Sequence, residues 1–348
     1  MLEQQITDDV RDYYGKVLAT NKDLKTNACC AADSMPLHLS RIAAEIHPEV
    51  KSKFYGCGSP IPEQLEGKTV LDLGSGSGRD CYLLSKLVGP HGKVIGVDMT
   101  DEQLEVARKH QEYHAEAFGM QESNITFVKG FIEDLAGAGI EDESVDLVIS
   151  NCVINLSPDK HKVFSEIFRV LKPGGELYFS DVFSDRRVPQ ELATDPVLVG
   201  ECLGGAMYTE DFRRQMSALG CRDYRVVAKS QILAGDPQIE ERIGLMGFWS
   251  ITLRAFKLDL EDRCEDYGQV AYYLGGVQEA PNAFRLDDHH LFEVGRPVPV
   301  CGNTADMLSQ SRFGSHFRIE GDKSRHFGLF DCGPTGSPQS SQDVGACC

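Results

Sequence analysis

The chain has 348 residues and twelve cysteines, whose thiolates can act as ligands, nucleophiles or redox groups. Thiolate sulfur is a soft ligand and selects soft metal ions. Buried cysteine can also serve simply as a small apolar side chain. No two cysteines have the Cys-x-x-Cys spacing of a zinc knuckle. A thiolate site in this chain would therefore have to be assembled from cysteines on separate segments.

A second candidate site is the run Asp72-Leu73-Gly74-Ser75-Gly76-Ser77-Gly78, which follows the apolar segment 69–73. Glycines allow a sharp turn and let the backbone approach a ligand closely. A dinucleotide-binding fingerprint would need a further glycine where this chain has Arg79. The pattern is instead Gly-x-Gly-x-Gly with an acidic residue before it.

The segments around this loop alternate between strand and helix patterns. We predict strands at 69–73, 93–98, 125–128, 145–150, 176–182 and 224–229, with helices at 79–88, 102–118, 161–171 and 212–219. This alternation is typical of a doubly wound α/β fold, a mostly parallel sheet with helices on both faces. Such sheets bind ligands outside the carboxyl ends of their strands, and the glycine loop lies at that edge.

Changes in composition suggest the domain organisation. Residues 1–37 are expected to form an arm, and 38–235 the main domain, with an insert near 184–210 that covers the sheet. A smaller α+β domain is expected at 236–331. The segment 332–348 is rich in Gly, Ser, Pro and Gln, which predicts a disordered tail.

The loop resembles the S-adenosylmethionine site of class I methyltransferases, which implies that fold and that cofactor. Asp98 after the second strand, Glu133-Asp134 after the third and Leu171-Lys172-Pro173-Gly174-Gly175 before the fifth extend the resemblance. It implies that Asp98 accepts the ribose hydroxyls, that the Glu133 region contacts the adenine amine, and that Asp72 positions the methionine end. Asn151 is explained equally well as a ligand contact or a turn residue. The predicted cofactor residues are Asp72, Gly74, Gly76, Gly78, Asp98, Met99, Ile132, Glu133 and Asn151.

Three cysteines are predicted to lie near this site. Cys152 follows the fourth strand, Cys202 lies in the insert, and Cys57 lies between two glycines just before the sheet begins. Three thiolates from separate loops suit trivalent arsenic, which takes three ligands in a pyramid. Its remaining lone pair can attack an electrophilic methyl group. We therefore expect these three cysteines to bind As(III).

Other cysteines are expected to have other roles. Cys81 and Cys221 fit the apolar core. Cys264 has no evident role, and Cys301 is expected to be structural. The predicted tail contains Cys332 and the final pair Cys347-Cys348, which is expected to be exposed rather than to bind a metalloid.

The whole arrangement resembles the arsenite S-adenosylmethionine methyltransferases over nearly the full chain. The matching segments are Tyr13-Tyr14-Gly15, Leu24-Lys25-Thr26-Asn27-Ala28-Cys29-Cys30, Tyr55-Gly56-Cys57-Gly58 and Phe292-Glu293-Val294-Gly295-Arg296. The family uses four cysteines, which fall on Cys57, Cys152, Cys202 and one of Cys29 or Cys30. The resemblance implies arsenite or its glutathione adduct as substrate. It further implies that Cys57 with Cys29 or Cys30 reduces oxidised arsenic, and that glutathione or thioredoxin restores the pair.

The composition of the chain limits which partners and which cell compartment we expect for this protein. The net charge of −18 disfavours nucleic acid as a partner. The first residues resemble no secretory signal, and no apolar run is long enough to span a bilayer, so we expect a cytoplasmic protein without membrane contact. We also expect the protein to be a monomer. Two alternatives remain: a class I methyltransferase acting on a small organic metabolite, and a metalloid-binding protein without catalysis. Cofactor binding would separate the second from an enzyme.

Overall fold

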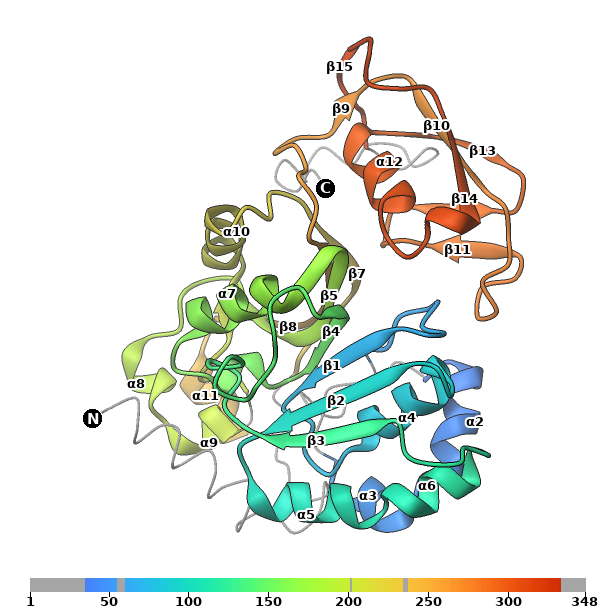
Figure 1. Cartoon of the computed structure of the whole chain (residues 1–348). Coiled ribbons are helices and arrows are strands. Elements are labelled where there is room, and N and C mark those ends of the chain that lie inside the picture. Colours follow the sequence, from blue (N-terminus) through green and yellow to red (C-terminus); the bar gives the residue numbers. More distant parts are fainter. Residues whose placement is uncertain (1–34, 55–59, 201, 234–236, 333–348) are drawn as a thin grey trace.

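The computed structural model describes residues 35–54, 60–200, 202–233 and 237–332 (Figure 1). Its main feature is an eight-stranded sheet with the order β3-β2-β1-β4-β5-β8-β7, in which β6 pairs with β5. The strands are β1 Thr69–Leu73, β2 Lys93–Asp98, β3 Ile125–Lys129, β4 Val145–Asn151, β5 Leu171–Ser184, β6 Met207–Tyr208, β7 Tyr224–Gln231 and β8 Phe248–Phe256. The first five strands are parallel, as predicted.

The order of the strands places the site. From β1 the chain first builds outward through β2 and β3, and then returns to the other side of β1 with β4 and β5. The connections therefore change direction between β1 and β4. In open α/β sheets this switch point leaves a crevice at the carboxyl ends of the strands, where ligands bind.

Helices cover both faces of the sheet, which confirms the doubly wound class. On one face, α7 Lys160–Val170 and α10 Thr209–Ala218 bury apolar side chains in a shared core. On the other face lie α2 Leu37–Glu45, α3 Pro48–Ser52, α4 Arg79–Val88 and α5 Asp101–Lys109. Cys81 of α4 and Cys221 are buried in these cores, as expected.

The single helix predicted at 102–118 is instead two helices, α5 and α6 Gln111–Ala117, with a break at His110. The His110 ring stacks on His47 with centroids 3.7 Å apart, and its Nε2 lies 2.9 Å from a Glu49 carboxylate oxygen. These contacts with the segment around α3 outweigh the uninterrupted helical pattern of the sequence.

The main sheet extends further along the chain than the predicted boundary near residue 235. Strand β8 runs antiparallel between β5 and β7. Between β7 and β8 lies α11 Pro237–Ile243, and the insert after β5 contains α8 Gln190–Ala193 and α9 Pro196–Gly200. Because β8 lies beyond the predicted boundary and still belongs to the main sheet, residues up to Phe256 are part of the main domain.

The C-terminal region is a smaller domain with its own apolar core, shown in orange and red in Figure 1. Its strands are β9 Glu265–Asp266, β10 Gln269–Tyr273, β11 Ala283–Arg285, β12 Leu291–Glu293, β13 Pro297–Val300, β14 Phe317–Glu320 and β15 Gly328–Leu329, and its helix is α12 Gly302–Ser309. They form the sheet β13-β10-β14 and two small pairs, β11-β12 and β15-β9. This agrees with the predicted α+β character.

The C-terminal domain packs against the end of the main sheet where the parallel strands begin. Arg312 contacts Glu176 in the first half of β5 and donates to the carbonyl oxygen of Glu63, just before β1, at 3.0 Å. Arg254 of β8 also pairs with Glu176, at 2.8 Å. The opposite end of the sheet, with the glycine loop, stays clear of this interface. Among the described helices, none has the length and apolar character needed to cross a membrane.

Candidate active site

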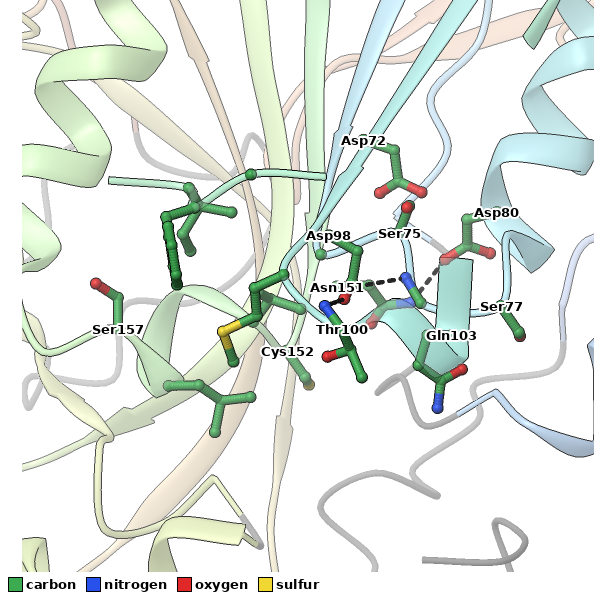
Figure 2. A pocket seen from close by; sticks show the side chains of 18 of the residues that line it. Asp72, Ser75, Ser77, Asp80, Asp98, Thr100, Gln103, Asn151, Cys152 and Ser157 are labelled. Atoms are coloured by element: carbon green, nitrogen blue, oxygen red, sulfur yellow. Dashed lines mark hydrogen bonds between the residues drawn. The ribbon is translucent and has the colours of Figure 1, made fainter. Parts of the chain in front are cut away.

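A pocket lies at the carboxyl ends of β1, β2, β3 and β4, at the predicted switch point (Figure 2). Including the part open to solvent, its volume is about 1030 Å³. The lining includes most of the predicted cofactor residues: Asp72, Gly74, Gly76, Asp98, Met99, Ile132, Glu133 and Asn151. It also includes Cys152.

The glycine loop forms one wall of this pocket. Gly76 has φ +52°, and a Cβ built on it would meet no atom within 4 Å, so this backbone faces open space. The Gly76 amide donates to the Asp98 carboxylate at 2.8 Å, which ties the loop to the end of β2. Gly78 differs, because it lies outside the pocket lining, and a Cβ on it would fall 2.8 Å from the Phe127 ring. Gly78 thus allows α4 to pack closely on β3.

Three carboxylates surround the loop, as Figure 2 shows: Asp72, Asp80 and Asp98. Burial raises the pKa of Asp72 well above its usual value, and the neighbouring Asp80 charge raises it further. Burial also raises the pKa of Asp98, although backbone amides of Thr100 and Gly76 donate to it and oppose the shift. A cationic ligand would relieve this repulsion, so the pocket favours positive charge.

Asn151 extends from β4 into the same network. Its Nδ2 donates to Asp80 Oδ2 at 3.1 Å, and Arg79 pairs with the other Asp80 oxygen at 2.6 Å. Asp80 was missed by the sequence analysis, because an acidic residue in the first turn of a helix is common for stability alone. Its position two residues after the last loop glycine was the available signal. Other lining residues that the sequence analysis did not predict include Lys53, Phe54, Thr100, Gln103, Phe131 and Ser157.

The far wall holds Ile132 and Glu133, which follow β3 as predicted. The Glu133 carboxylate accepts a hydrogen bond from the Ser157 hydroxyl. This bond joins the loop after β3 to the loop after β4 and fixes the width of the pocket between them.

Two of the predicted arsenic-binding cysteines meet at the same edge. Cys152 is 3% exposed and its amide donates to the Ser180 carbonyl at 2.9 Å. Cys202, from the insert, is fully buried, and its Sγ lies 3.5 Å from the Cys152 carbonyl oxygen. Cys152 is disulfide-bonded. Cys29, Cys30 and Cys57 lie outside the described residues.

Comparisons with known proteins agree with this geometry. Residues 64–228 match the model of a methyltransferase domain, and residues 266–344 match that of the arsenite methyltransferase C-terminal domain. The arsenite methyltransferase of Aquipseudomonas alcaligenes is 55% identical, with 94% of each chain covered. The human arsenite methyltransferase is 45% identical over 91% of this chain and 84% of its own.

A solved structure supports the same assignment. The arsenic (III) S-adenosylmethionine methyltransferase from Chlamydomonas reinhardtii superposes with a TM-score of 0.83 at 51% identity, covering 86% of this chain and 100% of that one. The similarity spans both domains. This chain therefore belongs to the arsenite methyltransferase family of S-adenosylmethionine-dependent enzymes.

Proposed function

We propose that this protein transfers a methyl group from S-adenosylmethionine to trivalent arsenic held by cysteine thiolates. One observation carries the proposal. Cys152 lines the pocket that contains the glycine loop, and the Cys202 sulfur lies next to the Cys152 carbonyl oxygen. A thiolate site next to a pocket for a positively charged methyl donor is what this reaction requires. An organic substrate would leave the approach of two cysteines at this edge without a role.

The residues of the pocket fit the cofactor in charge and in shape. Bound there, S-adenosylmethionine supplies an electrophilic methyl group on a sulfonium centre. Asp98 would accept the ribose hydroxyls, and Met99, Ile132 and Glu133 would surround the adenine. Asp72, with Asn151, would hold the ammonium of the methionine end. The open face of Gly76 leaves room for the backbone to approach that end closely.

The substrate would be arsenite or its glutathione adduct. Exchange onto Cys57, Cys152 and Cys202 forms three As–S bonds and releases water or glutathione. The arsenic lone pair then forms the As–C bond, while the methyl–sulfur bond breaks and its electron pair stays on the cofactor sulfur. Arsenic is thereby oxidised from the trivalent to the pentavalent state. The protein contributes mainly by fixing the two reacting atoms in line.

A two-electron reduction must follow before a second methyl group can be added. We propose that Cys57 with Cys29 or Cys30 supplies the electrons and becomes a disulfide. Glutathione or thioredoxin would then reduce that disulfide by thiol exchange. The disulfide at Cys152 is not the pair proposed here, and an external thiol would have to reduce it before Cys152 could bind arsenic.

The test is product analysis by chromatography with arsenic detection, after incubation with arsenite, S-adenosylmethionine and a thiol reductant. We expect methylated arsenic from the parent protein and from Cys221→Ser, whose thiol is buried in the apolar core and does not line the pocket. We expect none from Cys152→Ser or Cys202→Ser. Methylation by both of these variants at the parental rate would overturn the assignment. Omitting the reductant should stop the parent after a single turnover at most.

A further inference from the structure

Three cysteines that the methylation site does not use come together in the C-terminal domain. The sulfur atoms of Cys264, Cys301 and Cys332 all lie within 4.8 Å of one another. Cys264 and Cys301 are buried, and Cys332 is partly exposed. All three are thiols rather than disulfides. Three sulfurs bonded to one atom at about 2.3 Å lie at most about 4.0 Å apart, so one atom could bind all three once the sulfurs move somewhat closer together.

The fold gathers these thiols from three distant segments. Cys264 precedes β9, and Cys332 follows β15, which pairs with β9. The Phe330 amide donates to the Cys264 carbonyl at 2.8 Å, which holds the two chain segments side by side. Cys301 is the N-cap of α12, between β13 and the helix. The cluster therefore depends on tertiary structure rather than on sequence spacing.

Polar donors surround the Cys301 sulfur. The Thr304 amide lies 3.4 Å from it, the Thr304 hydroxyl 3.2 Å, and Arg225 Nη2 3.9 Å. Arg225 also pairs with Asp223 at 2.8 Å and with Asp287 at 3.3 Å, which fixes the guanidinium in place. Amide donors at a helix N-terminus and a nearby cation favour thiolate over thiol.

A purely apolar role does not explain this arrangement. Although Cys264 and Cys301 are buried, neither belongs to the apolar core of the C-terminal domain, which is built from side chains such as Phe284 and Phe313. Buried cysteines that act as small apolar groups do not need to converge around a guanidinium and a hydroxyl. The polar groups around these three sulfur atoms are instead what we expect around thiolates that bind a metal or metalloid.

The cluster is separate from the pocket that holds the glycine loop. None of its three cysteines lines that pocket. Cys301 contacts the main sheet at Arg225, near the start of β7, three strands away from β4 along the order β4-β5-β8-β7. At about 4.8 Å per strand this places the cluster roughly 14 Å or more from Cys152, too far for a methyl group held in the pocket to reach.

We propose that Cys264, Cys301 and Cys332 form a second binding site for trivalent arsenic, which holds the metalloid as a tris-thiolate without methylating it. Binding of arsenite would form three As–S bonds and release three water molecules. Structural zinc is almost always bound by four ligands. The group offers three thiol sulfurs, which is the number of ligands that trivalent arsenic takes.

Binding should also stabilise the C-terminal domain, because one atom would join three segments of chain. A ligand that binds only the folded state raises the melting temperature in proportion to the logarithm of its concentration. This gives a readout that does not depend on enzyme activity, and the proposal does not rest on the function proposed above.

The experiment uses the full-length chain with Cys29, Cys30, Cys57, Cys152, Cys347 and Cys348 replaced by serine, so that the methylation site and the chain ends cannot bind arsenite. Equilibrium dialysis against arsenite should give one arsenic per chain, and X-ray absorption should show three sulfur neighbours. Adding Cys332→Ser should weaken binding at least tenfold and leave at most two sulfur neighbours. Adding Cys221→Ser instead, as the control, should change neither.

Cys332 lies near the end of the described chain and is partly exposed, so its replacement should leave the fold intact. Equal melting temperatures of the two proteins without arsenite would verify this. As a second variant, Thr304→Val keeps the side-chain shape and removes one donor to Cys301, and should weaken arsenite binding several-fold. Unchanged stoichiometry and sulfur coordination in the Cys332→Ser protein would overturn the proposal. So would stoichiometric zinc in the untreated protein that is lost on Cys332→Ser.

Discussion

The Cys202 thiol lies 3.5 Å from the carbonyl oxygen of Cys152, and both residues have left-handed backbones, with φ +63° and +57°. Non-glycine residues rarely adopt this conformation. It typically costs about 1–3 kcal/mol and persists where the surrounding structure enforces it, often at functional sites. Both cysteines therefore carry backbone strain of the kind that is often found at functional sites.

This strain can be measured by comparing two substitutions of Cys202. Both Cys202→Gly and Cys202→Ala remove the thiol, but only glycine relaxes at positive φ. We expect the glycine variant to be more stable than the alanine variant by about 1 kcal/mol in urea unfolding. The matched control is Cys81 inside α4, where the order should reverse, because glycine weakens a helix interior by about 1 kcal/mol. The same order at both positions would refute the strain at Cys202.

Asp98 allows a test of cofactor binding. Its carboxylate accepts the amides of Gly76 and Thr100 at 2.8 Å each, and it borders the pocket. Asp98→Asn keeps the size and removes the charge, so we expect S-adenosylmethionine affinity to fall ten- to a hundredfold, about 1.4–2.8 kcal/mol. Isothermal titration calorimetry gives the affinity. Asp101→Asn, which alters an exposed pair with Lys129, should have almost no effect, and equal losses in both variants would argue against a contact with the ligand.

The first half of the fold was predictable because its signals are local. Segment 69–73 is apolar and ends in glycines, and Arg79–Val88 has one apolar stripe, so the strand, the loop and the helix could be placed from adjacent residues. The same reasoning correctly placed Asp72, Asp98 and Asn151 around one edge. The break at His110 could not be found in this way, because it depends on the stacking of His47, which lies in a different helical segment.

Features made by long-range pairing were missed for a physical reason. Strand β8 has no local signal that it lies between β5 and β7. Strands β9 and β15 have two residues each, too few for any periodicity, yet their pairing brings Cys332 to Cys264. Cys301 was expected to be structural and Cys332 to lie in a disordered tail. A cysteine site that is assembled from distant segments can be found only from the tertiary structure, whereas the glycine loop can be recognised from adjacent residues in the sequence.

The junction between the two domains depends on one buried carboxylate. Glu176 is fully buried and faces Arg254 and Arg312, so its removal leaves two arginines without their anion. Breaking such a pair typically costs about 3–5 kcal/mol, and we expect Glu176→Gln to lower the free energy of unfolding by that amount. Glu143→Gln, which alters a partly exposed pair with Lys257, should cost less than about 1 kcal/mol. Urea unfolding of both variants compares the loss of unfolding free energy at the buried Glu176 with the loss at the partly exposed Glu143.

Asp181 predicts how stability changes with pH. It is buried in β5 and accepts the amides of Val182 and Asn155 at 2.8 and 3.1 Å, while Lys160 provides the facing positive charge. Burial nevertheless raises the pKa of Asp181 to about 7. Between its ordinary pKa near 4 and pH 7 the folded protein therefore keeps a proton that the unfolded chain has released.

Unfolding then releases a proton in this range, so the free energy of unfolding should fall as the pH rises from 4 to 7 and level off above it. The contribution of Asp181 is on the order of 4 kcal/mol, since each pKa unit corresponds to about 1.4 kcal/mol. Asp181→Asn, which is neutral at every pH, should reduce this slope, and Asp185→Asn, an exposed site, should leave it unchanged. Urea unfolding at pH 5, 6, 7 and 8 measures the slope. If the Asp181→Asn protein loses stability with rising pH as steeply as the parent, the proton is held elsewhere, and the other buried carboxyls, Asp72 and Asp98, become the groups to replace next.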